Sequence, residues 1–465
     1  MPVHPIQDHS DQHLSDIYAS ETSERSLPKY RMREEMAEPH AAYSLIRDEL
    51  LLDGNARQNL ATFCTTWIED EVKQLMEDAV DKNMIDKDEY PQTAEIENRC
   101  VHILADLWHA QKSWDTVGCS TTGSSEAAML GGLALKWKWR QRREAEGKDT
   151  SKPNLVTGPV QICWKKFARY FDVEIREVPL EGDALGLQPE DLRKYCDENT
   201  IGVIPTLGVT FTGIYEPVEA LARELDAMER ELGIDIPIHV DAASGGFIAP
   251  FIQPDLKWDF QIERVRSINT SGHKYGLAPL GVGWIIWASK DDLPEDLIFN
   301  VDYLGGNMPT FALNFSRPGG EIIAQYYNFL RLGREGYTQV QQTCADTAQW
   351  LGEKLAEMDI FDIVYDGYGG LPAVAYKLKD GNHGFTLYDL SERVRMRGWQ
   401  IASYPLPSNR QETVVQRILV RHGVTRDLVG LLIEDIKRAI EHLKENPQPN
   451  SKAGPTFHHG GGEQK

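Results

Sequence analysis

The chain has 465 residues, which at roughly 150 residues per domain corresponds to two or three domains. Hydrophobic residues make up 41% of it, so a wholly disordered chain is excluded and a core can form without disulfides or metals. Lys and Arg number 49 against 71 Asp and Glu, a formal net charge of −22. That charge disfavours nonspecific binding to nucleic acid, because the phosphates would be repelled.

The six cysteines contain no C-x-x-C pair, so the sequence indicates no zinc site, and we predict no metal. Reduced, buried thiols in a cytoplasmic protein are the simplest interpretation. The first residues, MPVHPIQDHSDQHLSD, contain no apolar core, which argues against a signal peptide. The longest apolar stretch, around 282–288, is far shorter than the ~20 residues of a membrane span, so no integral membrane segment is expected.

The first part of the chain predicts helices and little core. Residues 1–25 are polar and acidic, which favours a tail or an assembly helix. Residues 30–57 look helical, and a stretch of mixed character follows to about 115. Residues 124–146 then predict a long helix, because Ser-Ser-Glu opens it, Ala, Leu and Met fill it, and three arginines crowd its end.

Strands and helices alternate after this helix. The expected elements are a strand at 201–209, a helix at 217–232, a strand at 236–241 and a strand at 281–288. Alternation of this kind predicts an α/β fold with a mainly parallel sheet and helices on both faces.

The C-terminal third predicts a second, smaller α/β unit. Residues 319–357 read as long helices that lead away from the first sheet. The elements expected after them are a strand at 373–378, a helix at 386–398, a strand at 414–420 and a helix at 426–445. We therefore predict four parts: an N-terminal helical or assembly segment (1–57), a large domain (58–345), a small domain (346–450) and a flexible tail (451–465).

Four separated features of the sequence carry chemistry. Ser271-Gly-His-Lys274 lies in a Gly-flanked loop, although alone Lys274 would be read as a solvated lysine. Gly123-Ser-Ser-Glu126 opens the long helix and is typical of an anion site, with a simple capping box as the alternative. Asp241 ends a predicted central strand, where α/β folds bind ligands, and Thr210 ends the preceding one. Together they supply a phosphate site, a carboxylate for a pyridine nitrogen and a Schiff-base lysine, the inventory for pyridoxal 5′-phosphate (PLP).

With these motifs the chain resembles the fold type I PLP enzymes of the group II amino-acid decarboxylase family, and most closely bacterial-type glutamate decarboxylases. The stretches that carry the resemblance are 52–63, 122–127, 161–164, 239–244, 271–274 and 300–306. The run Asn-Ala-Arg-Gln-Asn-Leu-Ala-Thr-Phe within the first is the most specific of them. The resemblance implies an aspartate aminotransferase-like fold. It has a large domain with a mainly parallel seven-stranded sheet flanked by helices, a smaller C-terminal α/β domain and an N-terminal helical segment.

The resemblance also assigns roles around the cofactor. Lys274 is implied as the catalytic lysine that bonds to PLP, and Asp241 as the partner that keeps the pyridine nitrogen protonated. The residues implied to hold or cover the rest of the cofactor are Ser124, Ser125, Ser271 and His273 at the phosphate, Gln161 stacked on the ring, and Thr210 at the cofactor oxygens.

The implied substrate is L-glutamate, decarboxylated to 4-aminobutanoate with uptake of a proton. Arg421 matches the α-carboxylate site, although Arg417 and His422 are close enough in the sequence to be the true match. The implied pocket for the distal carboxylate combines Thr62 and the Phe63 backbone with Asn83 and Asp86 of the partner subunit. Because Asp86 would face a carboxylate, the pair must share a proton, which predicts best binding at acid pH. Read without the resemblance, Asp86 is a solvated residue.

The resemblance further implies a homodimer as the minimal active unit, a homohexamer as the full assembly, a cytoplasmic location with membrane association at acid pH left open, and a role in acid resistance. His458 and His459 match a tail that plugs the site at neutral pH, with a functionless tail as the alternative. Calmodulin is not expected as a partner. Two other functions stay open: another PLP-dependent decarboxylase or carbon–carbon lyase, which Thr62, Asn83, Asp86 and Gln161 argue against, and a non-enzymatic scaffold.

Overall fold

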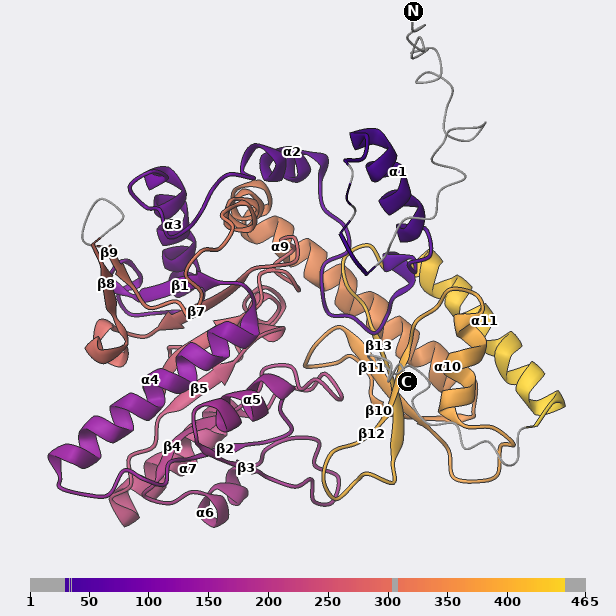
Figure 1. The fold of residues 1–465 in the computed structure, drawn as a ribbon. Coiled ribbons are helices and arrows are strands. Elements are labelled where there is room, and N and C mark those ends of the chain that lie inside the picture. The colour runs from indigo at the N-terminus through magenta and orange to yellow at the C-terminus, as the bar shows by residue number, and fades with distance from the viewer. Residues whose placement is uncertain (1–29, 33, 35, 303–307, 448–465) are drawn as a thin grey trace, which may run out of the picture. The chain divides into compact units, whose positions relative to one another are not determined.

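The computed structural model describes residues 30–32, 34, 36–302 and 308–447 (Figure 1). The chain divides into two compact units, residues 1–56 and 57–465. The described part of the first unit contains helix α1 (Pro39–Leu50). This helix begins at Pro39, whose fixed φ suits a first helical turn. The helix predicted over 30–57 is therefore too long at both ends.

The second unit contains a seven-stranded sheet. Its strands are β1 (Val117–Thr121), β2 (Asn154–Thr157), β3 (Glu174–Glu177), β4 (Thr200–Ile204), β5 (Ile238–Asp241), β6 (Val265–Thr270) and β7 (Gly283–Trp287). They lie in the order β1-β7-β6-β5-β4-β2-β3, and β7 alone runs antiparallel to its neighbours. The predicted mainly parallel seven-stranded sheet is thus confirmed.

Helices cover both faces of this sheet. They are α3 (Pro91–Leu107), α4 (Ser124–Ala145), α5 (Ile162–Tyr170), α6 (Leu192–Tyr195), α7 (Val218–Leu232) and α8 (Ala249–Ile252). Helix α2 (Asp70–Asp78) precedes them in the chain. Leu155 packs with α4 and α5 on one face, whereas its neighbour Val156 packs with α3 and α7 on the other. Successive side chains of a strand point to opposite faces, so apolar residues in succession, as in β2, require cover on both.

Strand β4 is shorter than the sequence predicts. It ends at Ile204, not at residue 209, because Pro205 has no amide hydrogen to continue the ladder. Only isolated bridges follow, one of them between Thr206 and Asp241. The chain after Pro205 is thereby released into loops at the carboxyl edge of the sheet, where it joins the site described below.

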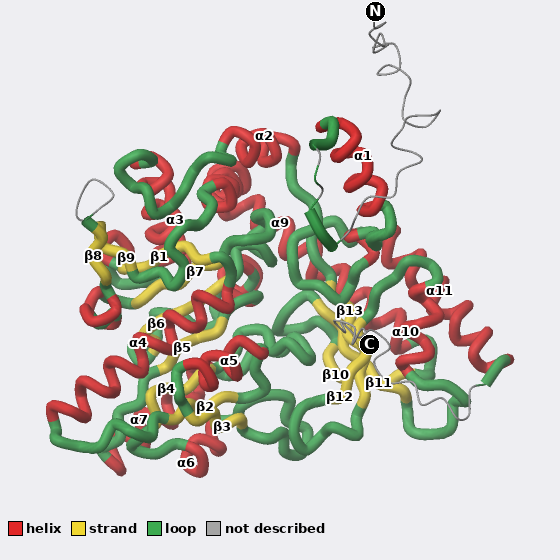
Figure 2. Tube along the Cα trace, in the orientation of Figure 1, coloured by secondary structure: helices red, strands yellow, loops and turns green. Residues whose placement is uncertain are grey.

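A second sheet follows the long helix α9 (Gly320–Ala356), which is kinked at Gly333. Its strands are β10 (Phe361–Tyr365), β11 (Ala373–Leu378), β12 (Ala402–Pro405) and β13 (Val414–Leu419), in the order β10-β11-β13-β12 and all antiparallel. Helices α10 (Leu387–Arg395) and α11 (Arg426–Glu445) pack on it. Strands β8 (Phe299–Val301) and β9 (Met308–Thr310) form a separate antiparallel pair. Figure 2 shows the two groups of strands separately.

Helix α9 contacts the parts of the chain around both sheets, because it packs against α2 and α3 and also against β10 and β11. It runs across residue 345, where we predict the boundary between the large and the small domain. The four-part division of the chain remains a prediction.

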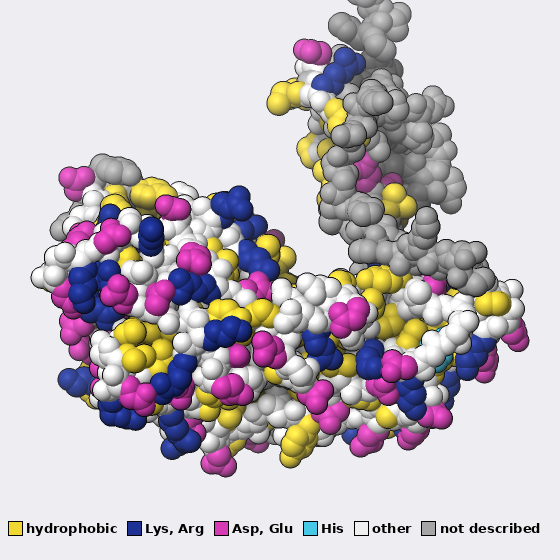
Figure 3. Space-filling view, turned by 90° about the horizontal axis from the view of Figure 1, so that it is seen from below, with side chains coloured by type: hydrophobic (Ala, Val, Ile, Leu, Met, Phe, Trp, Pro, Cys, Tyr) yellow, Lys and Arg dark blue, Asp and Glu magenta, His cyan; other side chains and the backbone are white. Residues whose placement is uncertain are grey.

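The surface is charged but mixed in sign. On the face seen in Figure 3, Lys and Arg side chains alternate with Asp and Glu. Among the described residues, no helix is both long and apolar enough to cross a lipid bilayer. In the same part of the chain, no group of three or more His, Cys, Asp or Glu is placed to hold a metal ion.

Candidate active site

A cavity of about 310 Å³ opens where the carboxyl ends of β4, β5 and β6 meet the amino end of α4. All eight residues that the sequence assigns to the cofactor line it: Ser124, Ser125, Gln161, Thr210, Asp241, Ser271, His273 and Lys274. These residues come from widely separated parts of the chain, and the parallel sheet brings them to one edge.

The amino end of α4 forms one wall. Its N-cap, Gly123, has φ +154° and no side-chain hydrogen bond caps the helix. A Cβ at Gly123 would lie 3.1 Å from His273 Cε1, so glycine is needed both for the backbone angle and for space. Ser124 is buried and Ser125 is exposed. Backbone amides and hydroxyls at a helix N-terminus suit a phosphate group.

His273 presents a defined donor to this wall. Its Nδ1 accepts hydrogen bonds from the amides of Val282 (3.2 Å) and Gly281 (3.4 Å). An acceptor Nδ1 carries no proton, so in the neutral ring the proton sits on Nε2. Burial, with the neighbouring Lys274 charge, lowers the pKa of His273 to about 4 and favours that neutral ring. His273 can thus donate one hydrogen bond to a phosphate oxygen.

Lys274 lies deep in the cavity. Its Nζ donates to Ser244 Oγ at 3.3 Å and lies 5.0 Å from the centre of the Phe63 ring. Burial lowers the pKa of Lys274, and the Asp241 carboxylate partly opposes this. A lysine whose charged form is disfavoured is a better nucleophile toward a carbonyl group.

Asp241 ends β5 and is almost completely buried. Its Oδ2 accepts a hydrogen bond from Trp164 Nε1 at 2.8 Å, and its Oδ1 accepts from Asn269 Nδ2 at 3.1 Å. Gln161, the N-cap of α5, accepts from the Cys163 amide at 2.6 Å. Cap formation orients the Gln161 side chain at the cavity wall.

The donor set fits pyridoxal 5′-phosphate. Within the described residues, the hydroxyls of Ser271 and Thr206 line the cavity, are buried and lack hydrogen-bond partners. Buried hydroxyls without partners are costly, and a ligand rich in oxygen acceptors would satisfy them. A helix N-terminus, a neutral histidine donor, a buried lysine and a buried carboxylate complete the set that this cofactor needs.

The loop that carries Thr62 and Phe63 is fastened beside Lys274. Thr65 donates from its amide to the His273 carbonyl (2.7 Å) and from its hydroxyl to the Lys274 carbonyl (2.6 Å). Thr62 Oγ1 accepts from the Cys64 amide at 3.2 Å. Both predicted substrate residues on this loop therefore lie next to the lysine.

Both candidate arginines lie by the same loop. Arg417, in β13, stacks on the Phe63 ring at 4.4 Å and donates to the carbonyls of Thr210 and Ala61. Arg421 follows β13, is buried, and donates to Thr66 Oγ1 at 3.4 Å. Burial lowers the pKa of the Arg421 guanidinium, yet an arginine side chain stays charged. The ring of the third candidate, His422, packs edge-to-face with the Trp67 ring, with 4.8 Å between the ring centroids.

Asn83 and Asp86 are not among the residues that line the Lys274 cavity. Asn83 Nδ2 donates to Asp86 Oδ2 at 2.9 Å, so the two predicted residues do lie together. The Arg317 amide donates to Asn83 Oδ1 at 3.2 Å and fixes the amide group. Their predicted contribution to a partner subunit's site stays a prediction. His458 and His459 lie outside the described residues.

Residues without a role assigned from the sequence also surround the site. Ser244 and Thr206 line the cavity, and Trp164 and Asn269 contact Asp241 from behind. Ser244 and Trp164 lie within the motifs that carry the resemblance. Their position beside Asp241 or Gln161 in those motifs could have identified them as site residues. Asn269 has no such signal, because its role depends on β5 and β6 being neighbours.

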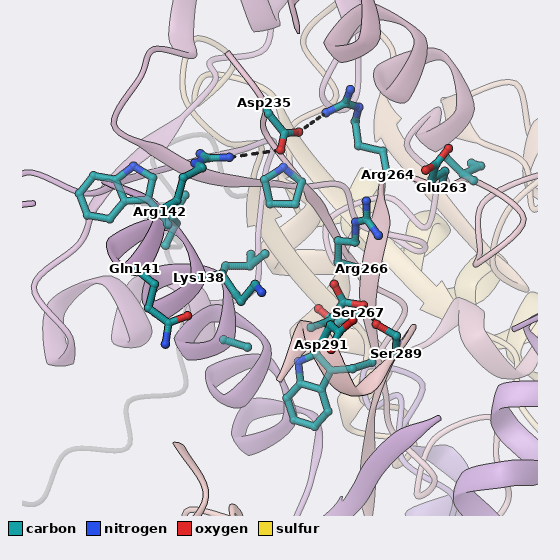
Figure 4. Close-up of a pocket in the computed structure, with 18 of the residues that line it drawn as sticks. Lys138, Gln141, Arg142, Asp235, Glu263, Arg264, Arg266, Ser267, Ser289 and Asp291 are labelled. Carbon is teal, nitrogen blue, oxygen red and sulfur yellow. Dashed lines mark hydrogen bonds and ion pairs between the residues drawn. The ribbon is translucent and has the colours of Figure 1, made fainter. Parts of the chain in front are cut away.

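A larger cavity, of about 880 Å³, lies at the opposite edge of the sheet. It is lined by the carboxyl-terminal half of α4 and the chain just before β5 and at the start of β6 (Figure 4). Its charges largely neutralise one another, since Asp235 pairs with Arg142 (3.2 Å) and Arg264 (2.9 Å). None of the predicted site residues lines it, so size does not identify the active site.

Comparison with known proteins defines the class. The profile of the pyridoxal-dependent decarboxylase conserved domain matches residues 28–379. The chain therefore belongs to the pyridoxal-dependent decarboxylase family, and the predicted cofactor, pyridoxal 5′-phosphate, is confirmed.

Individual proteins are also similar to this chain over most of its length. A protein of Aliivibrio fischeri named glutamate decarboxylase is 61% identical over 448 residues, 96% of this chain and 97% of that protein. A solved structure of Lactobacillus brevis glutamate decarboxylase has a TM-score of 0.89 at 45% identity and covers 92% of this chain and 98% of that one. The resemblance drawn from the sequence is thus confirmed. A Catharanthus roseus tryptophan decarboxylase, with a TM-score of 0.72 at 18% identity over 95% of this chain and 100% of that one, shares the fold.

Proposed function

We propose that this enzyme decarboxylates L-glutamate to 4-aminobutanoate and CO2. The observation that carries the proposal is the convergence of Lys274, Asp241 and the α4 amino end on one cavity, with Thr62 and Phe63 fastened beside the lysine. The 61% identity to a protein named glutamate decarboxylase supports the choice of substrate. In the overall reaction the bond from Cα to its carboxylate breaks, and a proton replaces CO2 at Cα.

The residues divide the chemical work. Bound PLP supplies an aldehyde that bonds to amines and a protonated ring that accepts electrons. Lys274, whose pKa is lowered by burial, would hold the cofactor through a bond from its amine to the aldehyde carbon. Asp241 stabilises the proton on the pyridine nitrogen. Ser124, Ser125, Ser271 and His273 bind the phosphate, while Gln161 and Thr210 hold the ring in place.

Two carboxylates of the substrate are recognised separately. Arg421 binds the α-carboxylate, for which its planar guanidinium is suited. Thr62 and the Phe63 backbone bind the distal carboxylate together with Asn83 and Asp86 of the partner subunit. The Asp86 carboxylate and the distal carboxylate of the substrate would share one proton, because two negative charges in contact repel each other. Substrate binding should therefore improve as the pH falls.

The proposal extends to physiology. Each turnover consumes one proton, so the reaction resists acidification of the cytoplasm and serves acid survival. Sites built from two chains require a homodimer at least, and the acidic N-terminal segment would assemble dimers into a hexamer. His458 and His459 would close the site at neutral pH.

The test measures 4-aminobutanoate formed from L-glutamate with added PLP, at acid and at neutral pH. We expect product at acid pH, little at neutral pH, and none from Lys274→Ala. L-Tryptophan and L-tyrosine serve as competing substrates in parallel reactions.

Failure has two distinguishable forms. A yellow, PLP-bound protein that ignores glutamate and releases CO2 from an aromatic amino acid would overturn the substrate assignment and leave the cofactor site intact. Full activity in Lys274→Ala would overturn the assignment of the catalytic lysine.

A further inference from the structure

Behind Asp241, a series of buried polar side chains runs away from the cavity. Ser267 Oγ contacts His239 Nδ1 at 2.7 Å, and His239 Nε2 contacts Asn269 Oδ1 at 2.7 Å. Asn269 Nδ2 then donates to Asp241 Oδ1 and to Ser124 Oγ. All of these side chains are at least nine-tenths buried.

The orientation of the Asn269 amide group determines where the protons lie in this series of hydrogen bonds. Asn269 Nδ2 faces two acceptors, the Asp241 carboxylate among them, so the Asn269 carbonyl faces His239 and must accept from Nε2–H. Burial lowers the pKa of His239 to about 4, so the ring is neutral and its Nδ1 accepts from the Ser267 hydroxyl. The three bonds from Ser267 through His239 and Asn269 therefore all point toward Asp241, and aligned bonds strengthen one another.

A second donor reaches the other carboxylate oxygen. Trp164 Nε1 donates to Asp241 Oδ2 at 2.8 Å, and the Ala243 amide adds a bond to Oδ1 at 3.1 Å. With Asn269 this makes three donors for the four lone pairs of the carboxylate, which leaves one on Oδ2. The protein thus satisfies the carboxylate almost fully and keeps one acceptor position for the cofactor.

Packing holds both donor routes to Asp241 in place, the one through Trp164 and the one through His239 and Asn269. The Trp164 ring lies edge-on between His239 (5.3 Å) and Phe167 (5.9 Å). Helix α4 covers this cluster through two glycines, because a Cβ at Gly131 would lie 2.4 Å from His239 and one at Gly132 would lie 2.6 Å from Phe167. The donors therefore cannot easily rotate away from Asp241.

The titratable groups that act electrostatically on or with Asp241 are Lys274, His239, Cys163 and Glu216. Because His239 is neutral, only Lys274 among them can bring a positive charge to the site. The hydrogen-bond donors from Trp164, Asn269 and the Ala243 amide therefore act on Asp241 in addition to the Lys274 charge.

The geometry points to a positioning network, Ser267–His239–Asn269 together with Trp164, that holds Asp241 ionised so that the proton at the cofactor ring stays on the pyridine nitrogen. This inference rests on the proposed role of Asp241. Hydrogen bonds to a carboxylate favour its charged form, and their removal from a buried site favours the neutral acid. Without the network, the proton would move from the nitrogen to Asp241.

The test rebuilds the holoenzyme with PLP labelled with nitrogen-15 on the ring and records the nitrogen NMR shift from pH 5 to pH 9. Wild-type protein is expected to show the protonated ring nitrogen throughout. Trp164→Phe and Asn269→Ala are expected to shift the signal toward that of unprotonated pyridine and to weaken PLP binding about tenfold, the scale of one hydrogen bond to a charged group.

Three further variants separate this function from simple packing. Phe167→Leu disturbs the same ring cluster without removing a donor, so it should lower the melting temperature and leave the nitrogen signal in place. Ser267→Ala removes one remote hydroxyl and should shift the signal less, in the same direction, in a protein that folds. Asp241→Asn provides the fully unprotonated reference.

Unchanged nitrogen signals and PLP affinities within twofold of wild type in both Trp164→Phe and Asn269→Ala would overturn the network. An unchanged signal in Asp241→Asn would overturn the role of Asp241 itself and, with it, this part of the proposed function. Neither measurement requires glutamate turnover, so a failed substrate test leaves both results valid.

Discussion

Arg417 and Arg421 differ in what their guanidinium groups already bind. Arg417 donates to two backbone carbonyls and stacks on Phe63, which commits it to holding the loop and β13 together. Arg421 donates to the Thr66 hydroxyl and lies beyond the end of the strand. The two carbonyls and the Phe63 ring favour Arg417 as a structural residue, and Arg421 stays the proposed ligand for the α-carboxylate.

We predict that Arg421→Lys raises the KM for glutamate about tenfold or more, because an ammonium group cannot form the paired hydrogen bonds of a guanidinium. Arg417→Lys should instead lower the melting temperature and change KM less. Steady-state kinetics and thermal unfolding of both variants check this, and a larger KM effect in Arg417→Lys would transfer the assignment to that residue.

His239 makes stability depend on pH. Its folded-state pKa of about 4 is below the ordinary histidine pKa of 6.5, so the unfolded chain takes up a proton first as the pH falls. The stabilisation is complete above pH 6.5 and is lost as the pH falls through 4. The protein should therefore be less stable at pH 4.5 than at pH 7, by an amount on the order of a few kcal/mol from this group.

The measurement compares the urea midpoint of the apoprotein at pH 7 and pH 4.5 in wild type and His239→Gln. The variant should be less stable at pH 7, where it loses native hydrogen bonds, but its stability should fall less between the two pH values. Parallel losses in the two proteins would show that His239 does not titrate in this interval.

Helix α4 serves the site at two places along its length. Its amino end supplies Ser124 and Ser125, and its Gly131 admits His239 from β5. A helix that bore a larger residue at position 131 would stand farther from the sheet, and its amino end would move with it. Close packing between α4 and the sheet is therefore part of the site.

Two glycine-to-alanine changes test this packing at the level of the helix. Gly131→Ala gains about 1 kcal/mol of helix propensity but must displace His239, which costs about 1–3 kcal/mol, so it should destabilise the protein and weaken PLP binding. Gly430→Ala in α11 meets no atom within 4 Å and should be stabilising by up to ~1 kcal/mol. The urea concentration at the midpoint of unfolding measures the stability of both variants. A Gly131→Ala protein more stable than wild type would contradict the close approach of α4 to His239.

At the scale of the whole molecule, the proposed substrate pocket needs a second chain. Asn83 and Asp86 hydrogen-bond to each other but do not line the Lys274 cavity of their own chain. Their proposed role therefore depends on a dimer in which each chain completes the other's site.

We predict that Lys274→Ala and Asp86→Ala, each nearly inactive alone, complement each other when they are unfolded and refolded together. Random pairing makes half of the dimers mixed, with one intact site in each, so activity should return to roughly a quarter of wild type. Size-exclusion chromatography confirms the dimers. If mixed dimers form and activity does not recover, the proposed role of Asp86 in the partner's site is wrong.

The sequence predicted some elements closely and others poorly, for physical reasons. The helix at 426–445 and the strand at 373–378 match α11 and β11, because strong periodicity and clear boundary residues mark them. Strands β1, β2, β3 and β6 were not predicted as strands, because they contain many polar residues, which obscure the apolar pattern of a buried strand. The strand at 201–209 was extended past Pro205, whose missing amide ends the ladder.

The sequence by itself indicated the family and the cofactor, and it singled out Lys274, Asp241 and the serines of α4 as candidate site residues, because these residues sit in short motifs that can be read along the chain. Only the tertiary structure decided which groups surround them. Trp164 and Asn269 belong to α5 and β6, and they reach Asp241 because the parallel sheet places the ends of distant segments side by side. Hydrogen bonds and burial depend on that proximity in space, which spacing along the chain does not encode.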